Sequence, residues 1–319
     1  MSRSSLGLLE RRLLFVTGKG GVGKTSVASA IGWLAASHGQ RTLVCEVDAK
    51  GNLSDFFGVG PLSFEPSEVR PDLFAMAMDT EESLKEYLRL NLRVPLVARM
   101  GPIARTFDFV ANAAPGVKEI LTVGKLAYEV RERNYDLVVV DASATGHVVG
   151  QLASPVAIND LIKVGLVRSQ TEWMIDLLTD ADTTGVVVVT VPEEMPTTET
   201  LELIDRLRDE TEIDVASVVV NRVLPELLGR NEEVLFDQLR TPVGEASLAT
   251  LVGGPVDHVL AGADLAVRMR RSRVQHLTRL REGLPSDVEL LYLPFLFHRS
   301  HGVRATARIA EAIGQELGF

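Results

Sequence analysis

The sequence is almost without cysteine: Cys45 is the single one among 319 residues. One cysteine excludes a disulfide within the chain, and it excludes a zinc or iron–sulfur site built from cysteines of one chain. Cys45 lies in the apolar run Thr42–Val47. Free cysteine is among the most buried residue types, so we expect Cys45 to be a buried strand residue.

Positive charge is also scarce. The chain has 33 Lys and Arg against 43 Asp and Glu, which gives a formal net charge of −10. A general nucleic-acid-binding surface needs an excess of positive charge, so DNA and RNA are not expected as main partners. A local basic patch is still compatible with this balance.

Long hydrophobic runs are missing as well. The most apolar runs, Leu137–Val140 and Val186–Val191, are far shorter than the ~20 residues that a membrane-spanning helix needs. Met1 to Arg12 contains no apolar stretch of signal-peptide length. We therefore expect a cytoplasmic protein without an integral membrane segment, and a peripheral association with a membrane stays open.

Seven short runs rich in Val, Leu and Ile alternate with longer segments of helical period. Continuous apolar runs are typical of strands that are buried on both faces of a parallel sheet, and alternation with helices indicates a doubly wound α/β fold with a mainly parallel sheet. The expected strands are Arg12–Thr17, Arg41–Val47, Asp72–Met78, Asp136–Asp141, Gly185–Val191, Val215–Asn221 and Val288–Pro294.

Two further segments look like helical additions to this core. They cover about residues 80–133 and 151–180, and they flank the expected strand Asp136–Asp141. We interpret residues 1–319 as a single domain of the P-loop NTPase type with a helical insertion. The insertion either presents a groove to a protein client or packs on a small core of its own.

A phosphate-binding loop follows the first strand and precedes a helical segment, and this setting confirms its motif, G-x-x-x-x-G-K-[ST]. Glycines let backbone N–H groups close around phosphate, and a helix N-terminus adds favourable partial charge. Lys24 is expected to reach the β- and γ-phosphates of ATP, and the Thr25 hydroxyl to bind Mg²⁺. The expected ATP-binding residues here are Gly18, Lys19, Gly20, Gly21, Val22, Gly23, Lys24, Thr25 and Ser26.

Two aspartates, Asp48 and Asp141, stand at the ends of expected strands. Ligands of open α/β sheets bind beyond the carboxyl ends of the strands. A carboxylate there can hold Mg²⁺ through water or position the attacking water. Either aspartate alone would more often be a helix cap or a turn residue, and the neighbouring phosphate loop favours the functional interpretation.

The second lysine of the loop, Lys19, points to one class of P-loop ATPase. The eight residues of the motif, Gly18–Thr25, resemble the deviant Walker A loop of the signal-recognition, partition and ion-pump ATPases. Further stretches are similar, in order, to the family of arsenite-pump and tail-anchored-protein targeting ATPases, in particular its cysteine-poor, single-copy actinobacterial branch. These stretches are Asp48 with Asn52–Asp55, Pro115–Glu119, Asp141–His147, Val189–Glu193 with the helix around Glu199–Leu207, Val218–Asn221 and Leu293–Phe295.

The resemblance implies roles for individual residues. Lys19 would reach across a dimer to the nucleotide of the partner, where a point charge on a long stem suits the task. Asp48 would activate the hydrolytic water. The remaining implied roles are Asp141 as the Walker B carboxylate toward Mg²⁺, Gly146 and His147 as γ-phosphate sensors, and Asn221, Pro294 and Phe295 as nucleotide contacts.

This chain departs from the family pattern in both switches. Ala49, Lys50 and Gly51 replace the usual Pro, Ala and His of switch I, and Ala144 replaces the usual Pro of switch II. The cysteines of the arsenite pump and of the targeting factor are also missing. The single nucleotide motif predicts one half of an active unit.

The function expected from these features is ATP hydrolysis with Mg²⁺ by a dimer that closes around nucleotide. The dimer would be a homodimer or a heterodimer with a related subunit, and closure would be coupled to a protein client or partner. Two alternatives stay open: an energy-coupling subunit of an anion or metalloid pump, and a partition or septum-positioning ATPase. A small-molecule kinase or ligase on the same fold would need a substrate pocket that the sequence does not reveal.

Overall fold

A computed structural model of the chain describes residues 7–48, 52–92, 116–162, 164–226, 228–297 and 302–319. Its centre is a sheet with the strand order β3-β4-β2-β5-β1-β6-β7-β8. All neighbouring strands are parallel except β3, which runs antiparallel to β4. The strands are β1 (Leu13–Gly18), β2 (Thr42–Glu46), β3 (Ser67–Arg70), β4 (Leu73–Ala77), β5 (Leu137–Asp141), β6 (Thr184–Thr190), β7 (Val215–Val223) and β8 (Glu289–Pro294).

The expected doubly wound, mainly parallel fold is confirmed, and all seven expected strands are present within a few residues. Five central strands were recognisable because nearly all of their side chains are buried, which keeps their sequences continuously apolar. β3 was not predicted. It is a short edge strand whose residues are largely exposed, so its sequence carries no apolar run.

Side chains alternate between two cores, one on each face of the sheet. Leu14 and Val16 of β1 face one core, and Leu13 and Phe15 face the other. This is the period of two that a strand imposes. The first core is covered by α1 (Lys24–Ser37), α2 (Asn52–Phe57) and α12 (Val303–Leu317), the second by α5 (Val117–Arg131), α6 (Thr145–Leu161), α7 (Leu166–Thr179), α8 (Glu194–Glu210) and the end of α11 (Asp257–Gly283).

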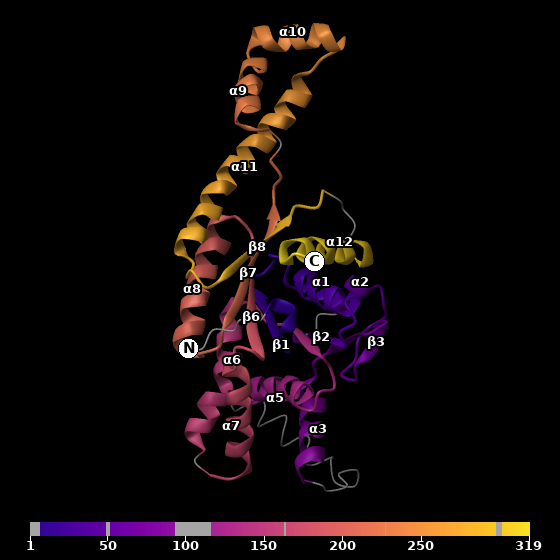
Figure 1. Cartoon of the computed structure of the whole chain (residues 1–319), viewed down its shortest axis with the longest axis vertical. Helices are drawn as coiled ribbons and strands as arrows, with labels where there is room; N and C mark the ends of the chain where they lie inside the picture. The colour runs from indigo at the N-terminus through magenta and orange to yellow at the C-terminus, as the bar shows by residue number, and fades with distance from the viewer. Residues whose placement is uncertain (1–6, 49–51, 93–115, 163, 227, 298–301) are drawn as a thin grey trace.

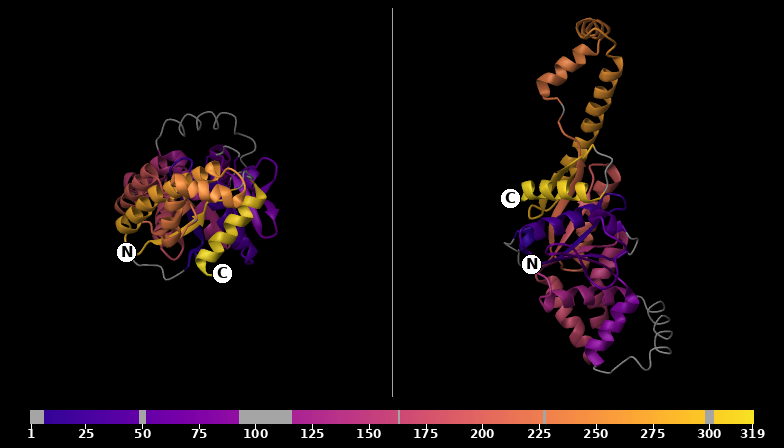
Figure 2. Two further views of the ribbon diagram at one scale, coloured as in Figure 1. Left: turned by 90° about the horizontal axis from the view of Figure 1, so that it is seen from above. Right: turned by 90° about the vertical axis from the view of Figure 1, so that its right-hand side faces the viewer.

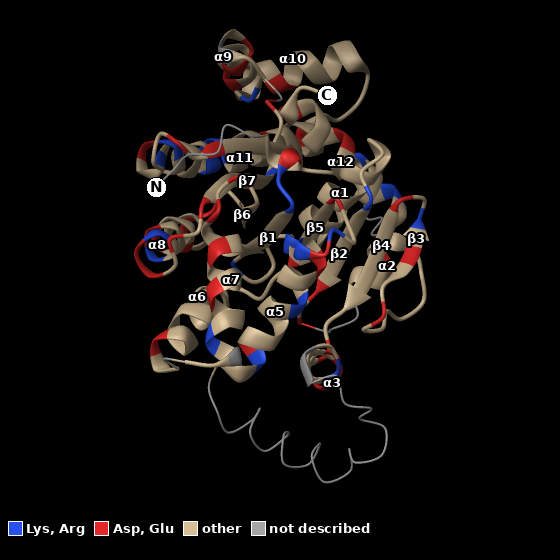
Figure 3. Ribbon diagram, turned by 60° about the horizontal axis from the view of Figure 1, so that its bottom comes forward, with Lys and Arg blue, Asp and Glu red and all other residues tan. Residues whose placement is uncertain are grey.

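Between β7 and β8 the chain forms a projection that was not predicted. We call it the arm; it consists of α9 (Arg230–Leu239), α10 (Pro242–Val252) and the first half of α11. The arm rises well away from the sheet in two perpendicular views (Figures 1 and 2). All residues of α10 are described and none is buried. The ribbon of α10 is nearly free of charged positions in Figure 3, and Glu245 is its single charge.

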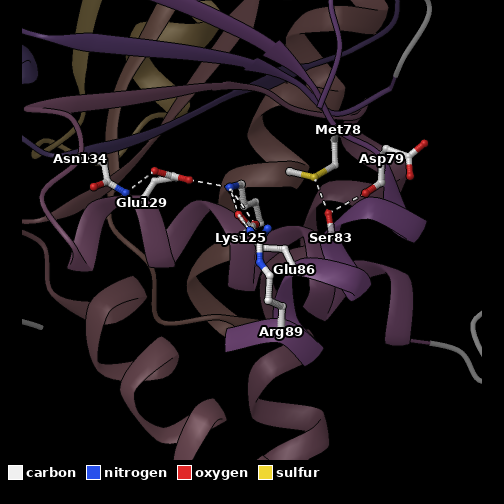
Figure 4. Close-up of polar contacts among 8 residues, drawn as sticks. All are labelled: Met78, Asp79, Ser83, Glu86, Arg89, Lys125, Glu129 and Asn134. Atoms are coloured by element: carbon white, nitrogen blue, oxygen red, sulfur yellow. Dashed lines mark hydrogen bonds and ion pairs between the residues drawn. The ribbon is translucent and has the colours of Figure 1, made fainter. Parts of the chain in front are cut away.

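Helices α3 (Thr80–Leu92), α5, α6 and α7 gather at the opposite end of the molecule (Figure 1). They coincide with the expected helical additions, except that α6 already begins at Thr145. A buried charge network joins α3 to α5 (Figure 4): Lys125 Nζ lies 2.8 Å from Glu86 Oε2 and 2.6 Å from Glu129 Oε1. Because buried charges are tolerated when paired, this network fixes α3 against α5.

The apolar residues of these helical segments differ in burial. Those between Val94 and Val110 lie outside the described residues. Met174 and Leu178 are buried, whereas Leu161 and Val164, beside the turn between α6 and α7, are each 82% exposed. Leu178 belongs to the core on the face of the sheet, so part of the set is buried against the sheet and not in a small separate core.

The last helix, α12, packs on α1 across Leu34 and Gly314 and is thus docked on the core. Among the described residues, no helix combines the length and the apolar character that crossing a membrane requires.

Candidate functional site

The phosphate loop joins β1 to α1, and two of its glycines are required by the backbone. Gly18 has φ 147°, and a Cβ there would lie 2.1 Å from the carbonyl oxygen of Val189. Gly23 has φ 101°, and a Cβ there would lie 2.5 Å from Asn221 Nδ2. Side chains at either position would clash and would also be strained. The loop is thus held tightly between the ends of β6 and β7.

The hydroxyl of Thr25 and the carboxylate of Asp141 meet beneath this loop. Thr25 Oγ1 donates a hydrogen bond of 2.6 Å to Asp141 Oδ2. β5 lies next to β1 in the sheet, so the strand order brings together two residues that are 116 positions apart. The expected pair for a Mg²⁺ site is therefore adjacent in the structure.

Burial raises the pKa of Asp141 from 3.8 to about 6. The hydrogen bond from Thr25 and the positive charge of Lys24 lower this pKa, while the negative charges of Glu46 and Asp48 raise it further. The carboxylate thus sits where ionisation is costly without a nearby cation. Such a group is suited to a position beside a divalent ion.

Glu46, at the end of β2, is a second carboxylate in this place, and sequence reasoning missed it. Glu46 is opposite Asp141 in the register of β2 and β5 and is 2% exposed. Its Oε1 accepts a hydrogen bond of 3.0 Å from the backbone N–H of Asn52, while its buried Oε2 has no hydrogen-bond partner within the described residues. The sequence did offer a signal for this role, because Glu46 ends an apolar run two residues before Asp48.

The two lysines of the loop lie in different surroundings. Lys24 Nζ is 3.4 Å from the backbone carbonyl oxygen of Lys19, so it stays over the loop. The ammonium of Lys19 forms an ion pair with the carboxylate of Glu199 on α8. The two lysines thus have different polar partners, and the phosphate-loop motif did not indicate Glu199 as one of them.

The switch residues lie around the same edge of the sheet. Asp48 is exposed just beyond β2, while Ala49, Lys50 and Gly51 lie outside the described residues. Gly146 and His147 are exposed in the first turn of α6. Switch II is tied to the loop strand because Thr17 Oγ1 donates a hydrogen bond of 2.9 Å to the carbonyl oxygen of Ser143.

The remaining expected contacts come from β7 and β8. Asn221 Nδ2 donates a hydrogen bond of 2.8 Å to the carbonyl oxygen of Val22, which anchors the loop to the end of β7. The backbone N–H of Phe295 donates one of 2.8 Å to the carbonyl oxygen of Val223, and Pro294 is exposed beside it. Asn221 thus contacts the phosphate loop, whereas Pro294 and Phe295 lie at the end of β8 beside β7, and the contact of all three with nucleotide stays a prediction.

Comparison with known proteins decides the family. The model of the anion-transporting ATPase family matches residues 11–172 and 163–238. The chain belongs to the anion-transporting ATPase family. ATPase BagA of Mycobacterium tuberculosis is 31% identical to it over 298 residues, which cover 89% of this chain and 86% of that protein. A mycobacterial relative agrees with the actinobacterial resemblance of the sequence.

Two further relatives resemble the chain less than ATPase BagA does. An ATPase ASNA1 homolog of Entamoeba dispar is 27% identical over 66% of this chain and 76% of that protein. A protein of Halobacterium salinarum described as a candidate arsenical pump-driving ATPase is 28% identical over 74% of this chain, but the match covers 39% of that protein. The family resemblance drawn from the motifs is confirmed, and the individual site roles remain to be tested.

Proposed function

We propose that this member of the anion-transporting ATPase family hydrolyses ATP with Mg²⁺ as a dimer that closes around nucleotide, and that closure is coupled to a protein client or partner. The observation that carries the proposal is the pair Thr25 and Asp141, 2.6 Å apart beneath a phosphate loop with two lysines. The paired residues supply a magnesium position, and the loop supplies a phosphate position.

The phosphate loop, Asp48 and Lys24 would each have a separate role in ATP hydrolysis. The backbone of the loop and the start of α1 hold the phosphates of ATP. Asp48 accepts a proton from the attacking water, whose oxygen bonds to the γ-phosphorus as the bond from that phosphorus to the bridging oxygen of ADP breaks. Lys24 neutralises negative charge on the β- and γ-phosphates as this occurs.

The residues present fit a magnesium ion. The buried Oε2 of Glu46 has no hydrogen-bond partner among the described residues, and Asp141 lies opposite Glu46 in the sheet. Thr25 would bind the ion directly, with Asp141 through water and Glu46 beside that water shell. The ion would supply positive charge to the phosphates of ATP.

Lys19 would act in trans. A second cation placed beside Lys24 on the same phosphates would be repelled by it. In this structure Lys19 is directed instead to α8 through its ion pair with Glu199. A lysine that leaves its own loop can reach the nucleotide of a facing subunit, whether that subunit is identical or a related ATPase.

A mixing experiment tests this proposal. Lys19→Ala binds ATP but supplies no trans lysine, whereas Lys24→Ala supplies the lysine but does not hold ATP. We expect each variant alone to lose turnover and the mixture to regain part of it, measured as phosphate release at increasing protein concentration. Full activity of Lys19→Ala as a strict monomer in sedimentation would refute the trans role.

The helical group of α3, α5, α6 and α7 would carry the client. Leu161 and Val164, each 82% exposed, offer apolar side chains beside the turn between α6 and α7. We expect Leu161→Ser with Val164→Ser to weaken capture of an apolar tail peptide without lowering basal ATP turnover. Val259→Ser on the arm, where Val259 is 72% exposed, is the matched control and should leave capture unchanged.

The pump alternative has less support from the described residues. Cys45 is fully buried, and burial raises the pKa of its thiol far above the usual range. A protonated, inaccessible thiol is a poor ligand for a soft metalloid. Arsenite that stimulated turnover of the wild type, but not of Cys45→Ala, would restore the pump interpretation.

A further inference from the structure

The ion pair between Lys19 and Glu199 joins two parts of the chain that are 180 residues apart in sequence. Lys19 follows β1, and Glu199 lies in the second turn of α8, which follows β6. β1 and β6 are neighbours in the sheet, with Gly18 in register with Val189. The strand order thus places the start of α8 beside the phosphate loop, and Glu199 reaches the loop from there.

We infer that Glu199 is the positioning residue for Lys19, and that it holds the lysine on its own subunit until closure brings the phosphates of the partner's ATP. This inference rests on the proposed trans role of Lys19. The Lys19 side chain is directed to α8 when it pairs with Glu199 and would have to be directed to the facing subunit to reach the partner's phosphates, so the two contacts compete for one side chain. Every closure must therefore break the pair with Glu199.

The strength of the pair suits a reversible restraint. The side chains of Lys19 and Glu199 are 31% and 28% exposed, so water and salt screen their attraction. Removing one such pair is expected to change an equilibrium by roughly 1.4- to 5-fold. Closure of a symmetric dimer breaks two pairs, so the expected effect on closure is about 2- to 25-fold, the square of that range.

The surroundings of Lys24 show why the restraint acts on Lys19 alone. Lys24 Nζ lies 3.4 Å from the carbonyl oxygen of Lys19, so this lysine already stays over its own loop. Glu199 draws the Lys19 ammonium toward α8 and away from Lys24. The lysine required in cis and the lysine proposed in trans are thus separated before ATP is hydrolysed.

The test is Glu199→Gln, which keeps the size of the side chain and removes its charge. At saturating ATP and low salt, the protein concentration that gives half-maximal turnover per chain should fall about 2- to 25-fold, while the maximal turnover stays within about twofold. The difference from wild type should shrink at ~1 M salt, where the Debye length is about 3 Å. A merely structural residue would not produce this salt-dependent shift.

Glu202→Gln is the matched control, because Glu202 is an exposed carboxylate one turn further along α8. It should leave the half-maximal concentration unchanged. Thermal melting of both variants checks that the fold is intact.

Combination with Lys19→Ala separates this inference from the proposed function. If Glu199 acts through Lys19, adding Glu199→Gln to Lys19→Ala changes nothing. If Lys19→Ala loses turnover but Glu199→Gln matches wild type or lowers the maximal rate, the restraint is wrong and the trans role stands. If Lys19→Ala is fully active as a monomer, the trans role itself is wrong.

Discussion

The phosphate loop and the arm both begin where a parallel strand ends, the loop after β1 and the arm after β7. Their surroundings differ. Leu14 and Val16 beneath the loop are fully buried. In the arm, Phe236, Val256 and Val267 are buried, but many of the large exposed apolar side chains of the described residues also lie there: Val234, Leu235, Val243, Leu251, Val252, Val259, Leu265 and Met269.

Polar contacts differ in the same way. At the loop, Asp141 is buried and each contact joins separate elements, as in the hydrogen bond from Thr25. Two ion pairs join α9 and its C-terminal end to α11: Arg240 lies 2.7 Å from Asp264, which is buried, and Arg271 lies 2.8 Å from Glu233 in an exposed pair. Exposed pairs contribute little to stability. The sheet edge that carries the phosphate loop is thus held by buried contacts, whereas the arm carries many exposed apolar side chains, and the following changes test this difference.

The largest expected effect is at Lys24. Lys24→Ala removes the fixed cation from the β- and γ-phosphates, so ATP turnover should fall at least about 100-fold. Calorimetry measures the loss of ATP binding, and a phosphate-release assay measures the loss of turnover. Lys85→Ala on α3 removes a half-buried lysine paired with Glu81 and Glu82 and should leave turnover unchanged. Turnover near the wild-type rate in a folded Lys24→Ala would refute the phosphate-loop assignment.

Asp48→Asn is expected to have the next largest effect on ATP turnover. The amide cannot accept a proton from water, so turnover should fall by about 10²- to 10⁴-fold while ATP still binds. Single-turnover measurement of bound ATP separates chemistry from affinity. Asp205→Asn, an exposed aspartate on α8, is the control. Weaker ATP binding with unchanged hydrolysis of bound ATP would make Asp48 a structural residue.

The sequence predicted the phosphate loop but not the arm, and the reason lies in the contacts that hold each region. The loop and its flanking strands were predicted because their motif is contiguous and their burial keeps the strands apolar. Glu199 was missed because its partner, Lys19, is 180 residues away and no local pattern marks the contact. The arm was missed for another reason. The sequence of α10 is apolar, which normally indicates burial, yet all residues of α10 are described and none is buried.

Asp141→Asn tests whether the buried carboxylate beside the phosphate loop lowers the stability of the fold. The pKa of Asp141 is raised from 3.8 to about 6, mainly by burial, so ionising it destabilises the folded state. Asp141→Asn should therefore raise the melting temperature at pH 7.5 by a few degrees, about 1 kcal/mol or more, and lower turnover. The gain should shrink as the pH falls from about 6 towards 3.8, where the wild-type group is protonated. A gain that does not depend on pH would point to another cause.

The same substitution in the two regions gives a direct measure of the contrast. Leu14 is fully buried in β1, and Leu251 is 84% exposed in α10. Leu14→Ala should cost about 2–5 kcal/mol of unfolding free energy, because it leaves a cavity in a close-packed core. Denaturant titration at a fixed temperature measures this cost.

Leu251→Ala should change the unfolding free energy by no more than about 0.5 kcal/mol, since an exposed side chain loses little apolar contact. The same denaturant titration applies, with ATP turnover measured in parallel and expected to stay at the wild-type rate. Dilution of the protein sharpens the result, because a contact between chains would weaken as the concentration falls. A cost above about 2 kcal/mol that disappears on dilution would show that α10 is buried in an assembly. The same cost at every concentration would contradict the exposed position of Leu251.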